Sequence, residues 1–346
     1  LFRQFGIYSS EGQKYEPEDI DKVMYYRESE SGIMLEEGIN EAGAFSAWLA
    51  LATSYSNNKL PMVPFYIFYS MFGFQRIHDL AWAAGDSRAK GFLLGATSGR
   101  TTLNGEGLQH QDGHSHILAS TIPNCKSYDP CFGYELAIII QEGLKEMYEQ
   151  GLDVFYYITL MNENYEHPQI PNKIDKFDLI KGAYLFDGKS NPHIRILASG
   201  ITVRLAQEAI QILKKFKVVA ELWSITSFNE LYKEGIEIDR ANILKKNKEK
   251  SHVEKCFGNK LPTIAVSEYQ RAFPNQIRKW VNGEYIVLGT DGFGRSDTRD
   301  KLREFFEIDE KNIVFQSLLL LEKFKEAEEY AISNKMKIKD KAPWKK

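Results

Sequence analysis

The sequence predicts an α/β fold arranged in two domains, and three observations lead to this prediction. The chain has 346 residues, which is enough for about two domains of ordinary size. Short apolar segments alternate with helical segments, a pattern typical of a largely parallel sheet. A polar segment with two prolines, residues 162–177, divides the chain and is interpreted as a surface linker. The expected domains are therefore residues 1–175 and 176–346.

The expected elements of the first domain follow a polar, irregular stretch at residues 1–32. A helix is expected over residues 35–52, which are rich in helix-forming and small residues. Residues 60–70 are expected to form a buried strand after a proline-marked turn, and residues 72–86 have helical periodicity. The other elements expected here are a strand at 90–99, a long loop, a helix at 132–149 and a strand at 153–161.

The second domain continues the alternation of strands and helices. Strands are expected at 194–200, 218–226, 263–269 and 284–289. Helices are expected at 201–216, 228–236, 297–308 and 312–334, several of which place apolar residues at i, i+3 and i+4. No internal repeat or low-complexity tract interrupts this pattern.

Composition and charge exclude several classes of protein. The formal net charge of −3 gives no global field that would point to nucleic acid or to an anionic membrane as partner. No run approaches the length of apolar sequence that spans a membrane, so no membrane association is expected. A signal peptide is not visible, and the chain starts without a methionine, so we expect it to be a piece of a longer protein.

The three cysteines, Cys125, Cys131 and Cys256, fit no disulfide framework. Their number is odd, and no CxxC pair is present, which argues against a zinc ribbon or a redox motif. A reducing compartment, the cytoplasm, is the expected location.

The segment LNGEGLQHQDGHSH, residues 103–116, places His110, His114 and His116 within seven positions. Two or three imidazoles at this spacing could bind one metal ion. The segment is rich in glycine and polar residues, however, so it is not a helix of the kind that carries HExxH. Three interpretations stay open on these residues alone: a metal site, a catalytic or substrate-binding loop, and a polar structural loop.

The segment GTDGFG, residues 289–294, follows an apolar strand. Its glycines suggest a phosphate cradle, but their spacing is not GxGxxG. We favour a turn from a strand to a helix, in which Ser296 or Asp297 caps the helix.

Two further segments contain candidate site residues. EEGINEAG, residues 36–43, has three glutamates where a helix is expected to start, and such acids usually favour the helix N-terminus. Glu41 lies among small and apolar residues and is expected to face inward, where a carboxyl group can hold or give a proton near neutral pH. PFYIFYSMFGFQ, residues 64–75, has six aromatic residues, most of them expected in the core, although a flat ring could also stack a heterocycle.

Six longer segments together resemble one protein family. They are residues 36–43, 53–86, 95–125, 158–171, 227–235 and 287–306. They are similar to the homodimeric bacterial pyruvate dehydrogenases, the thiamin-diphosphate-dependent decarboxylating component of the pyruvate dehydrogenase complex. The similarity covers essentially the whole chain, is near-literal over its first half, and is sparser from about residue 170 to 280.

The resemblance implies a transketolase-like protein, of which this chain holds the middle and C-terminal domains. The middle domain is the pyrimidine-binding domain, a parallel sheet with helices on both faces, and the C-terminal domain is a transketolase C-terminal-like α/β domain. The family's diphosphate motif contains GDG, but the only Gly-Asp pair here, Gly85-Asp86, is followed by serine. The domain that binds the diphosphate and Mg²⁺ is therefore expected to be missing, and the isolated fragment is expected to be inactive.

The resemblance also implies roles for individual residues. Glu41 is expected to place a protonated carboxyl against the aminopyrimidine ring of thiamin diphosphate. Phe72 is expected to stack on that ring, with Tyr69 beside it. His110 is expected to face the substrate, and Glu106 to order the loop or the cofactor. His114 and His116 receive no role, and no metal ligand is assigned.

The implied partners are a second copy of the chain in a homodimer, pyruvate as substrate, and the dihydrolipoyl acetyltransferase whose lipoyl group is reductively acetylated. Two alternatives remain. One is a non-catalytic dimerisation or assembly module. The other is a metal hydrolase that uses His110, His114 and His116, with Asp112 or Glu106 as a fourth ligand.

Overall fold

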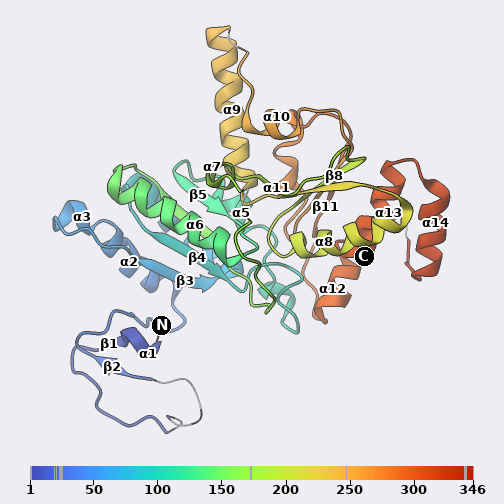
Figure 1. The fold of residues 1–346 in the computed structure, drawn as a ribbon. Helices are drawn as coiled ribbons and strands as arrows, with labels where there is room; N and C mark the ends of the chain where they lie inside the picture. The colour runs from blue at the N-terminus through green and yellow to red at the C-terminus, as the bar shows by residue number, and fades with distance from the viewer. Residues whose placement is uncertain are drawn as a thin grey trace.

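The structure is a computed structural model that describes residues 2–18, 20, 22, 26–171, 174–246, 248–338 and 341–345. Two β-sheets form its centre, and a small two-stranded sheet lies near the N-terminus (Figure 1). Strands and helices alternate along the chain, so the predicted α/β class is confirmed.

The first central sheet has four parallel strands in the order β3-β4-β6-β5. Its strands are β3 Phe65–Tyr69, β4 Phe92–Ala96, β5 Cys125–Tyr128 and β6 Phe155–Thr159. Every residue of β6 is buried, whereas β3 lies at an edge. Parallel strands end at the same edge of a sheet, so the segments that follow β3 and β4 emerge next to each other.

Helices cover both faces of this sheet, as expected. They are α2 Glu41–Ala52, α4 Ser70–Asp86 and α5 Ser115–Ala119 on one face, and α6 Gly133–Leu144 on the other, which continues into a π-helical turn, Lys145–Glu149. Neighbouring residues of a strand point to opposite faces. Leu93 accordingly joins the apolar cluster that contains α4, and Leu94 joins the cluster that contains α6.

The second central sheet has five strands in the order β11-β10-β8-β9-β7. Its strands are β7 Tyr184–Asp187, β8 Ile194–Ala198, β9 Ala220–Ser224, β10 Thr263–Val266 and β11 Tyr285–Leu288. The strands pair in parallel except for β7, which is antiparallel to β9. A parallel sheet is normally covered on both faces, and two sets of helices provide the cover.

One set is α8 Thr202–Leu213, α13 Glu310–Leu320 and α14 Phe324–Ser333, and the other is α9 Phe228–Lys245, α10 His252–Phe257 and α11 Ala272–Asn275. The first set shares one continuous apolar cluster with α6 and with strands of both sheets. The two halves of the chain are therefore joined by a common core. Helix α12, Arg299–Phe305, lies on the connection between β11 and α13.

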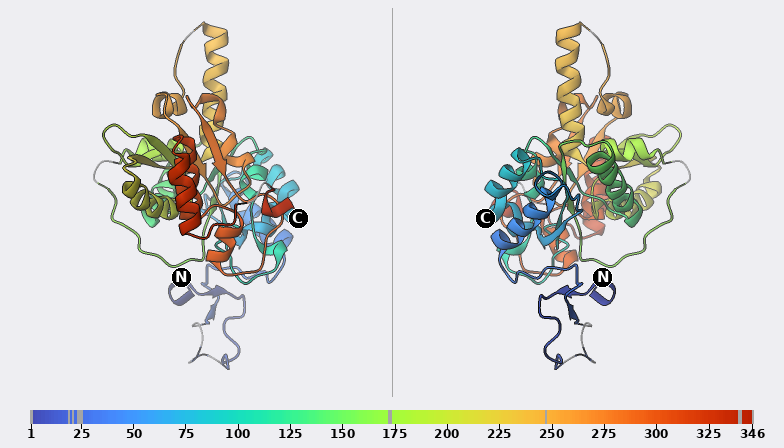
Figure 2. Two further views of the ribbon diagram at one scale, coloured as in Figure 1. Left: turned by 90° about the vertical axis from the view of Figure 1, so that its right-hand side faces the viewer. Right: turned by 90° about the vertical axis from the view of Figure 1, so that its left-hand side faces the viewer.

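The remaining elements are short. They are α1 Phe2–Phe5, β1 Ile7–Tyr8, β2 Glu28–Ser29, α3 Ser54–Asn57, α7 Lys176–Lys181 and the 3₁₀ turns Leu108–His110, Lys214–Phe216, Arg278–Trp280 and Pro343–Lys345. The N-terminal segment with β1 and β2 projects from the body on one side, and α9 projects on the opposite side (Figure 2).

Two predictions in the first half are wrong in detail. The helix expected over residues 35–52 begins only at Glu41, because Asn40 caps it: its side-chain oxygen accepts the backbone N–H of Gly43 at 3.1 Å. The strand β3 was expected to be buried, yet Phe65 and Ile67 are about half exposed. As an edge strand, β3 has a neighbour on one side only.

Three predictions in the second half also need correction. The single helix expected over residues 312–334 is two helices, because the chain turns at Glu322, whose φ is +56°. The helix expected to end at residue 236 continues to Lys245. Helix α12 begins after Thr298, whose side chain makes no capping hydrogen bond, so neither Ser296 nor Asp297 is the cap.

The expected linker, 162–177, contains no helix or strand before Lys176 among its described residues, and Asn172 and Lys173 lie outside the described residues. All three cysteines are free thiols. Among the described residues, no helix combines the length and the apolar character needed to cross a membrane.

Candidate active site

Three of the residues singled out in the sequence lie together at the carboxyl edge of the first sheet. Tyr69 ends β3, Phe72 lies in the first turn of α4, and His110 lies in the loop that follows β4. The ring centroid of His110 is 5.1 Å from that of Phe72 and 6.2 Å from that of Tyr69, both edge-to-face. Tyr69 and Phe72 are 6.1 Å apart. This edge is where α/β sheets usually bind ligands.

Glu41 reaches the same cluster through Arg76. It is the first residue of α2, and its carboxylate accepts a hydrogen bond from the guanidinium of Arg76 on α4. The Cζ atom of Arg76 lies 4.4 Å from the centroid of the Phe72 ring. The carboxyl group is therefore linked to the aromatic ring by a stacked cation.

The surroundings of Glu41 differ from those expected. The side chain is largely covered, with 18% exposed, but it pairs with a cation and does not lie among apolar groups only. Arg76 was not among the residues singled out in the sequence. Its position four residues after Phe72 on an amphipathic helix is the signal that could have identified it, because such residues lie one above the other.

His110 also faces Glu106. The Nδ1 atom of His110 lies 3.4 Å from Oε2 of Glu106, but the geometry is not that of a hydrogen bond, and this buried nitrogen has no hydrogen-bond partner. Both side chains are partly exposed. Glu106 is thus close enough to orient the imidazole, and the ring keeps hydrogen-bonding capacity for another group.

The other two histidines point elsewhere. The Nε2 atom of His114 accepts a hydrogen bond from the Gln75 side chain at 3.0 Å, and burial lowers the pKa of His114. His116 is fully buried: its Nε2 lies 3.0 Å from Oγ1 of Thr159, and its ring stacks on Phe273 at 4.9 Å. Burial lowers the pKa of His116 to about 4, so this imidazole is neutral at physiological pH.

Asp112 has a structural role in this loop. Its Oδ1 accepts the backbone N–H groups of His114 and Ser115, both at 2.9 Å, at the start of α5. In the part of the chain that the structure describes, no group of three or more His, Cys, Asp and Glu side chains is arranged to hold a metal ion. The geometry of the three imidazoles therefore does not support the metal-site interpretation of the loop.

Two buried acids near this loop were missed in the sequence. Asp129 follows β5 and accepts a hydrogen bond from Thr159 at 2.7 Å, and burial raises its pKa to about 6. Glu268 follows β10 and accepts a hydrogen bond from Thr102 at 2.8 Å; burial raises its pKa to about 7, although Arg303 opposes the shift. Both acids lie just after the carboxyl end of a strand, and that position is the signal that could have identified them.

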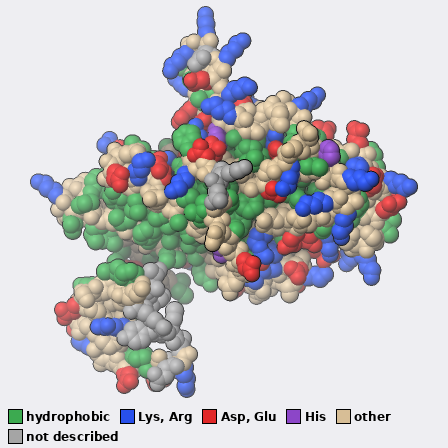
Figure 3. Space-filling view, in the orientation of Figure 1, with side chains coloured by type: hydrophobic (Ala, Val, Ile, Leu, Met, Phe, Trp, Pro, Cys, Tyr) green, Lys and Arg blue, Asp and Glu red, His purple; other side chains and the backbone are tan. Residues whose placement is uncertain are grey.

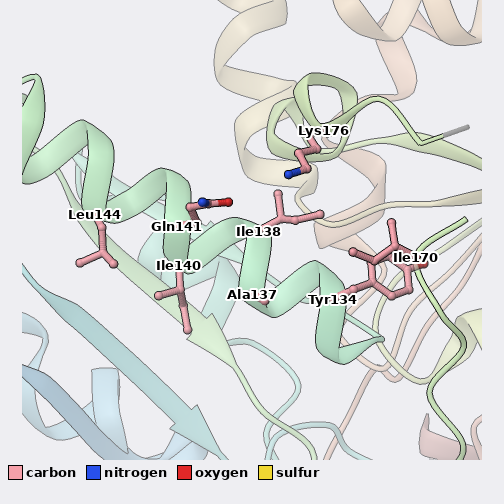
Figure 4. A pocket seen from close by; sticks show the side chains of 8 residues that line it. All are labelled: Tyr134, Ala137, Ile138, Ile140, Gln141, Leu144, Ile170 and Lys176. Carbon is pink, nitrogen blue, oxygen red and sulfur yellow. The ribbon is translucent and has the colours of Figure 1, made fainter. Parts of the chain in front are cut away.

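A separate shallow hollow lies on the outer face of α6 (Figure 4). It is lined by Tyr134, Ala137, Ile138, Ile140, Gln141, Leu144, Ile170 and Lys176. Among the lining residues, only Gln141 has an amide and only Lys176 has a charge. The hollow therefore has few groups that could take part in a reaction. In the same region, apolar side chains gather into a broad exposed area over α6 and the neighbouring strands (Figure 3).

Solved structures similar to the chain include transketolases. A mutant transketolase from Pichia stipitis superimposes with a TM-score of 0.65 at 15% identity, covering 86% of this chain and 39% of that chain. A split-gene transketolase superimposes with a TM-score of 0.61 at 12% identity, covering 93% of this chain and 92% of that chain. The chain thus has the transketolase-like fold.

Sequence comparisons are more specific. The family model of the pyruvate dehydrogenase E1 component middle domain matches residues 1–168, and that of the transketolase-like TK C-terminal domain matches residues 182–309. The pyruvate dehydrogenase E1 component of Pseudomonas aeruginosa is 56% identical over 92% of this chain, and that of Escherichia coli K12 is 51% identical over 92%. The chain is thus similar to pyruvate dehydrogenase E1 components over most of its length. It spans only 37% and 36% of the length of these two relatives.

Proposed function

We propose that this chain is part of a thiamin-diphosphate-dependent pyruvate dehydrogenase. The longer protein would decarboxylate pyruvate and reductively acetylate the lipoyl group of a dihydrolipoyl acetyltransferase. One observation carries the proposal for this chain: a carboxyl group, a stacking ring and an imidazole, from Glu41, Phe72 and His110, converge at the carboxyl edge of a parallel sheet. The similarity to pyruvate dehydrogenase E1 components supports it.

The chain would supply one side of the cofactor site. Residues 1–175 would form the pyrimidine-binding domain, and residues 176–346 the C-terminal domain. The diphosphate and Mg²⁺ would be held by a domain that lies outside this chain. Thiamin diphosphate supplies the carbanion chemistry when it is bound, and the protein positions and tunes it.

The stacking face of Phe72 fits such a cofactor ring. The guanidinium of Arg76 already lies over this face, 4.4 Å from the centroid. A flat group is therefore accommodated here, and the planar ring of an aminopyrimidine could stack in the same place. Tyr69, which is 45% exposed, would border the same ring.

Glu41 would hold a proton against a ring nitrogen, and this role requires Arg76 to move. A carboxylate that is paired with a guanidinium does not donate a proton. The stacked Arg76 occupies the place that a cofactor ring would take over Phe72. We propose that Arg76 would move off the Phe72 ring to make room for a cofactor ring, which would leave Glu41 in a covered site free to hold a proton.

His110 would serve the substrate side of the site. Its imidazole sits edge-on to Phe72, next to the face on which the cofactor ring would stack. The Nδ1 atom has no hydrogen-bond partner, and Glu106 lies 3.4 Å away to orient the ring. His110 would donate or accept a proton at the substrate.

The proposed assembly is a homodimer in the cytoplasm. The exposed apolar area over α6 and the neighbouring strands is a surface that a second copy could cover (Figure 3). The three free cysteines fit a reducing compartment.

A second candidate function is a non-catalytic assembly module, and one observation favours it for the isolated chain. The split-gene transketolase whose chain has almost the same extent is described as an inactive β4 tetramer. An isolated copy of this chain would likewise associate with itself without catalysing a reaction. The same residues would become active only when the diphosphate-binding domain is present.

The test is pyruvate decarboxylation by this chain mixed with a separately produced diphosphate-binding domain. Glu41→Gln keeps the size of the side chain but removes the acid, so activity should fall by about 100-fold or more. Glu36→Gln, on the exposed segment before α2, is the matched control and should retain wild-type activity. Full activity of Glu41→Gln in the mixture would contradict the role of Glu41.

A further inference from the structure

The His110 loop, residues 97–114 between β4 and α5, is held by a turn that belongs to the other half of the chain. This turn, residues 289–297, joins β11 to α12 and contains the GTDGFG segment. We call it the C-terminal turn. The sequence of this turn predicts only a connection from a strand to a helix, but its contacts indicate a further role.

Gln111, the neighbour of His110, is the centre of these contacts. Its side chain is fully buried. The Oε1 atom accepts the backbone N–H of Arg295 in the C-terminal turn at 2.7 Å. The Nε2 atom donates to the backbone carbonyl of Leu103 at 2.6 Å. One side chain therefore ties two parts of the His110 loop to each other and to the C-terminal turn.

Further hydrogen bonds join the same two segments. Arg100 donates from Nη1 to the backbone carbonyl of Thr290 at 2.7 Å and also to that of Gly292. The backbone N–H of Gly105 donates to the carbonyl of Asp297 at 3.1 Å. The Arg100–Thr290 bond is buried and the Arg100–Gly292 bond is partly buried. Breaking either of them would leave polar groups unsatisfied, so both resist displacement of the loop.

Gly294 allows this close approach. A Cβ atom at this position would lie 2.6 Å from Oε1 of Gln111 and 2.6 Å from the backbone carbonyl oxygen of Leu108. Leu108 is in the same 3₁₀ turn as His110. Any side chain at residue 294 would therefore push directly on the turn that presents the imidazole.

The base of the loop is held from the same half of the chain. Thr101 and Thr102 both donate to the buried carboxyl group of Glu268, and the Thr102 bond is 2.8 Å long. The Nε atom of Arg299, at the start of α12, donates to the carbonyl of Thr102 at 2.8 Å. The His110 loop thus has anchors at its base and near its tip.

We propose that the C-terminal turn is a positioning element that sets the place of His110 relative to Phe72, acting through Gln111 and Gly294. Neither residue is among those proposed to contact the substrate or the cofactor. The positioning itself follows from the contacts, and its effect on catalysis rests on the proposed function of His110.

Hydrogen exchange of the 346-residue chain tests the positioning without cofactor. In Gly294→Ala, amides of the His110 loop should exchange roughly tenfold faster, because about one hydrogen bond is lost. Amides in α6 should be unchanged. Gly133→Ala is the matched control, since its Cβ would meet only a side-chain atom of His167 at 3.7 Å. Unchanged exchange in the loop of Gly294→Ala would overturn the proposal.

A second pair of variants covers the case in which Gly294→Ala fails to fold. Gln111→Asn is one methylene too short to reach both Arg295 and Leu103, so loop exchange should rise. Gln111→Glu keeps the acceptor for the Arg295 N–H but not the donor to Leu103, and it should lie between Gln111→Asn and wild type. Equal exchange in all three proteins would also overturn the proposal.

Activity of this chain mixed with the diphosphate-binding domain distinguishes the proposed positioning of the His110 loop from the proposed catalytic role of His110. If the positioning matters, Gln111→Asn should lower kcat with little change in cofactor affinity, and Gln111→Glu should recover part of the loss. Faster hydrogen exchange in the loop with unchanged kcat would support the positioning role of the C-terminal turn but contradict the catalytic role of His110. No change in either measurement would contradict the positioning.

Discussion

At the scale of single residues, His116 and His110 differ in burial although both come from one polar segment of the sequence. His116 lies in α5 with no exposed surface, stacked on Phe273 and hydrogen bonded to Thr159. A charged imidazole would lose its hydration there, so the pKa of His116 falls from 6.5 to about 4. His116 is thus a structural residue that joins the two halves of the chain.

This shift predicts a pH dependence of stability. The unfolded chain binds a proton at His116 below pH 6.5, whereas the folded chain does not do so until about pH 4. The contribution of His116 is therefore complete above pH 6.5 and decreases as the pH falls toward 4, by roughly 3 kcal/mol in total. Urea unfolding of wild type and His116→Gln at several pH values measures it.

The difference in unfolding free energy between wild type and His116→Gln isolates the contribution of His116, because Asp129 and Glu268 titrate in both proteins. The stability of the wild type relative to His116→Gln should decline between pH 6.5 and 4. A difference that stays constant over this range would contradict the burial of a neutral imidazole.

Single residues also show what could be predicted from the sequence. The family resemblance implied that Tyr69, Phe72 and His110 serve one cofactor site. The structure brings these three residues together because β3 and β4 are parallel neighbours. Arg76 was missed because a charged residue on a helix usually faces solvent. Glu41 was expected among apolar groups only, because the cation that pairs with it comes from a different helix.

At the scale of elements, α4 links the core to the candidate site. Its inner face carries Phe74, which is 1% exposed and packs edge-to-face on Tyr157 at 4.8 Å. Its outer face carries Trp82, which is 50% exposed. Phe72 and Arg76 extend from the same helix toward Glu41 and His110. Packing of α4 against the sheet therefore determines where these site residues lie.

We expect Phe74→Ala to lower the free energy of unfolding by about 3–5 kcal/mol, because it removes a large buried ring and leaves a cavity. Trp82→Ala on the same helix should change it by about 0.5 kcal/mol or less. Denaturant unfolding of both variants measures the two values. Similar losses for both would mean that α4 is not packed on the sheet by its Phe74 face.

Some elements could not be predicted from local pattern. The strands β5 and β7 were missed: β5, CKSY, has only four residues with little apolar character, and β7 is a short antiparallel edge strand. Their strand conformation depends on pairing with β6 and β9, which are distant in sequence. The break between α13 and α14 was missed because the apolar periodicity continues across it.

At the scale of the whole molecule, long-range contacts join the two halves. One apolar cluster includes strands of both central sheets, and the bond between Arg100 and Thr290 spans 190 residues. The two-part α/β class could be predicted from the alternation of segments. The contact of the His110 loop with the C-terminal turn could not, because nothing in either segment encodes the position of the other.

The exposed apolar area predicts association of the chain with itself. Analytical ultracentrifugation should show a dimer or larger species, because burial of this surface removes apolar area from water. Leu144→Lys, in the hollow on α6, should weaken the association by placing a charge in the interface. Ile332→Lys on α14 is the control, since 71% of this side chain is exposed, and it should not weaken the association.

A monomeric wild-type chain at micromolar concentration would contradict the proposed dimer. Equal weakening by Leu144→Lys and Ile332→Lys would place the contact elsewhere on the surface.

Calorimetric titration with thiamin diphosphate and Mg²⁺ tests most directly the proposal that this chain supplies one side of the cofactor site. It is done with this chain alone, with the separately produced diphosphate-binding domain alone, and with their mixture, with Glu41→Ala as the variant. The proposal predicts binding that is strong only in the mixture and fails with Glu41→Ala. No binding in a properly folded mixture, or equal binding with Glu41→Ala, would contradict the proposed role of this chain in the cofactor site.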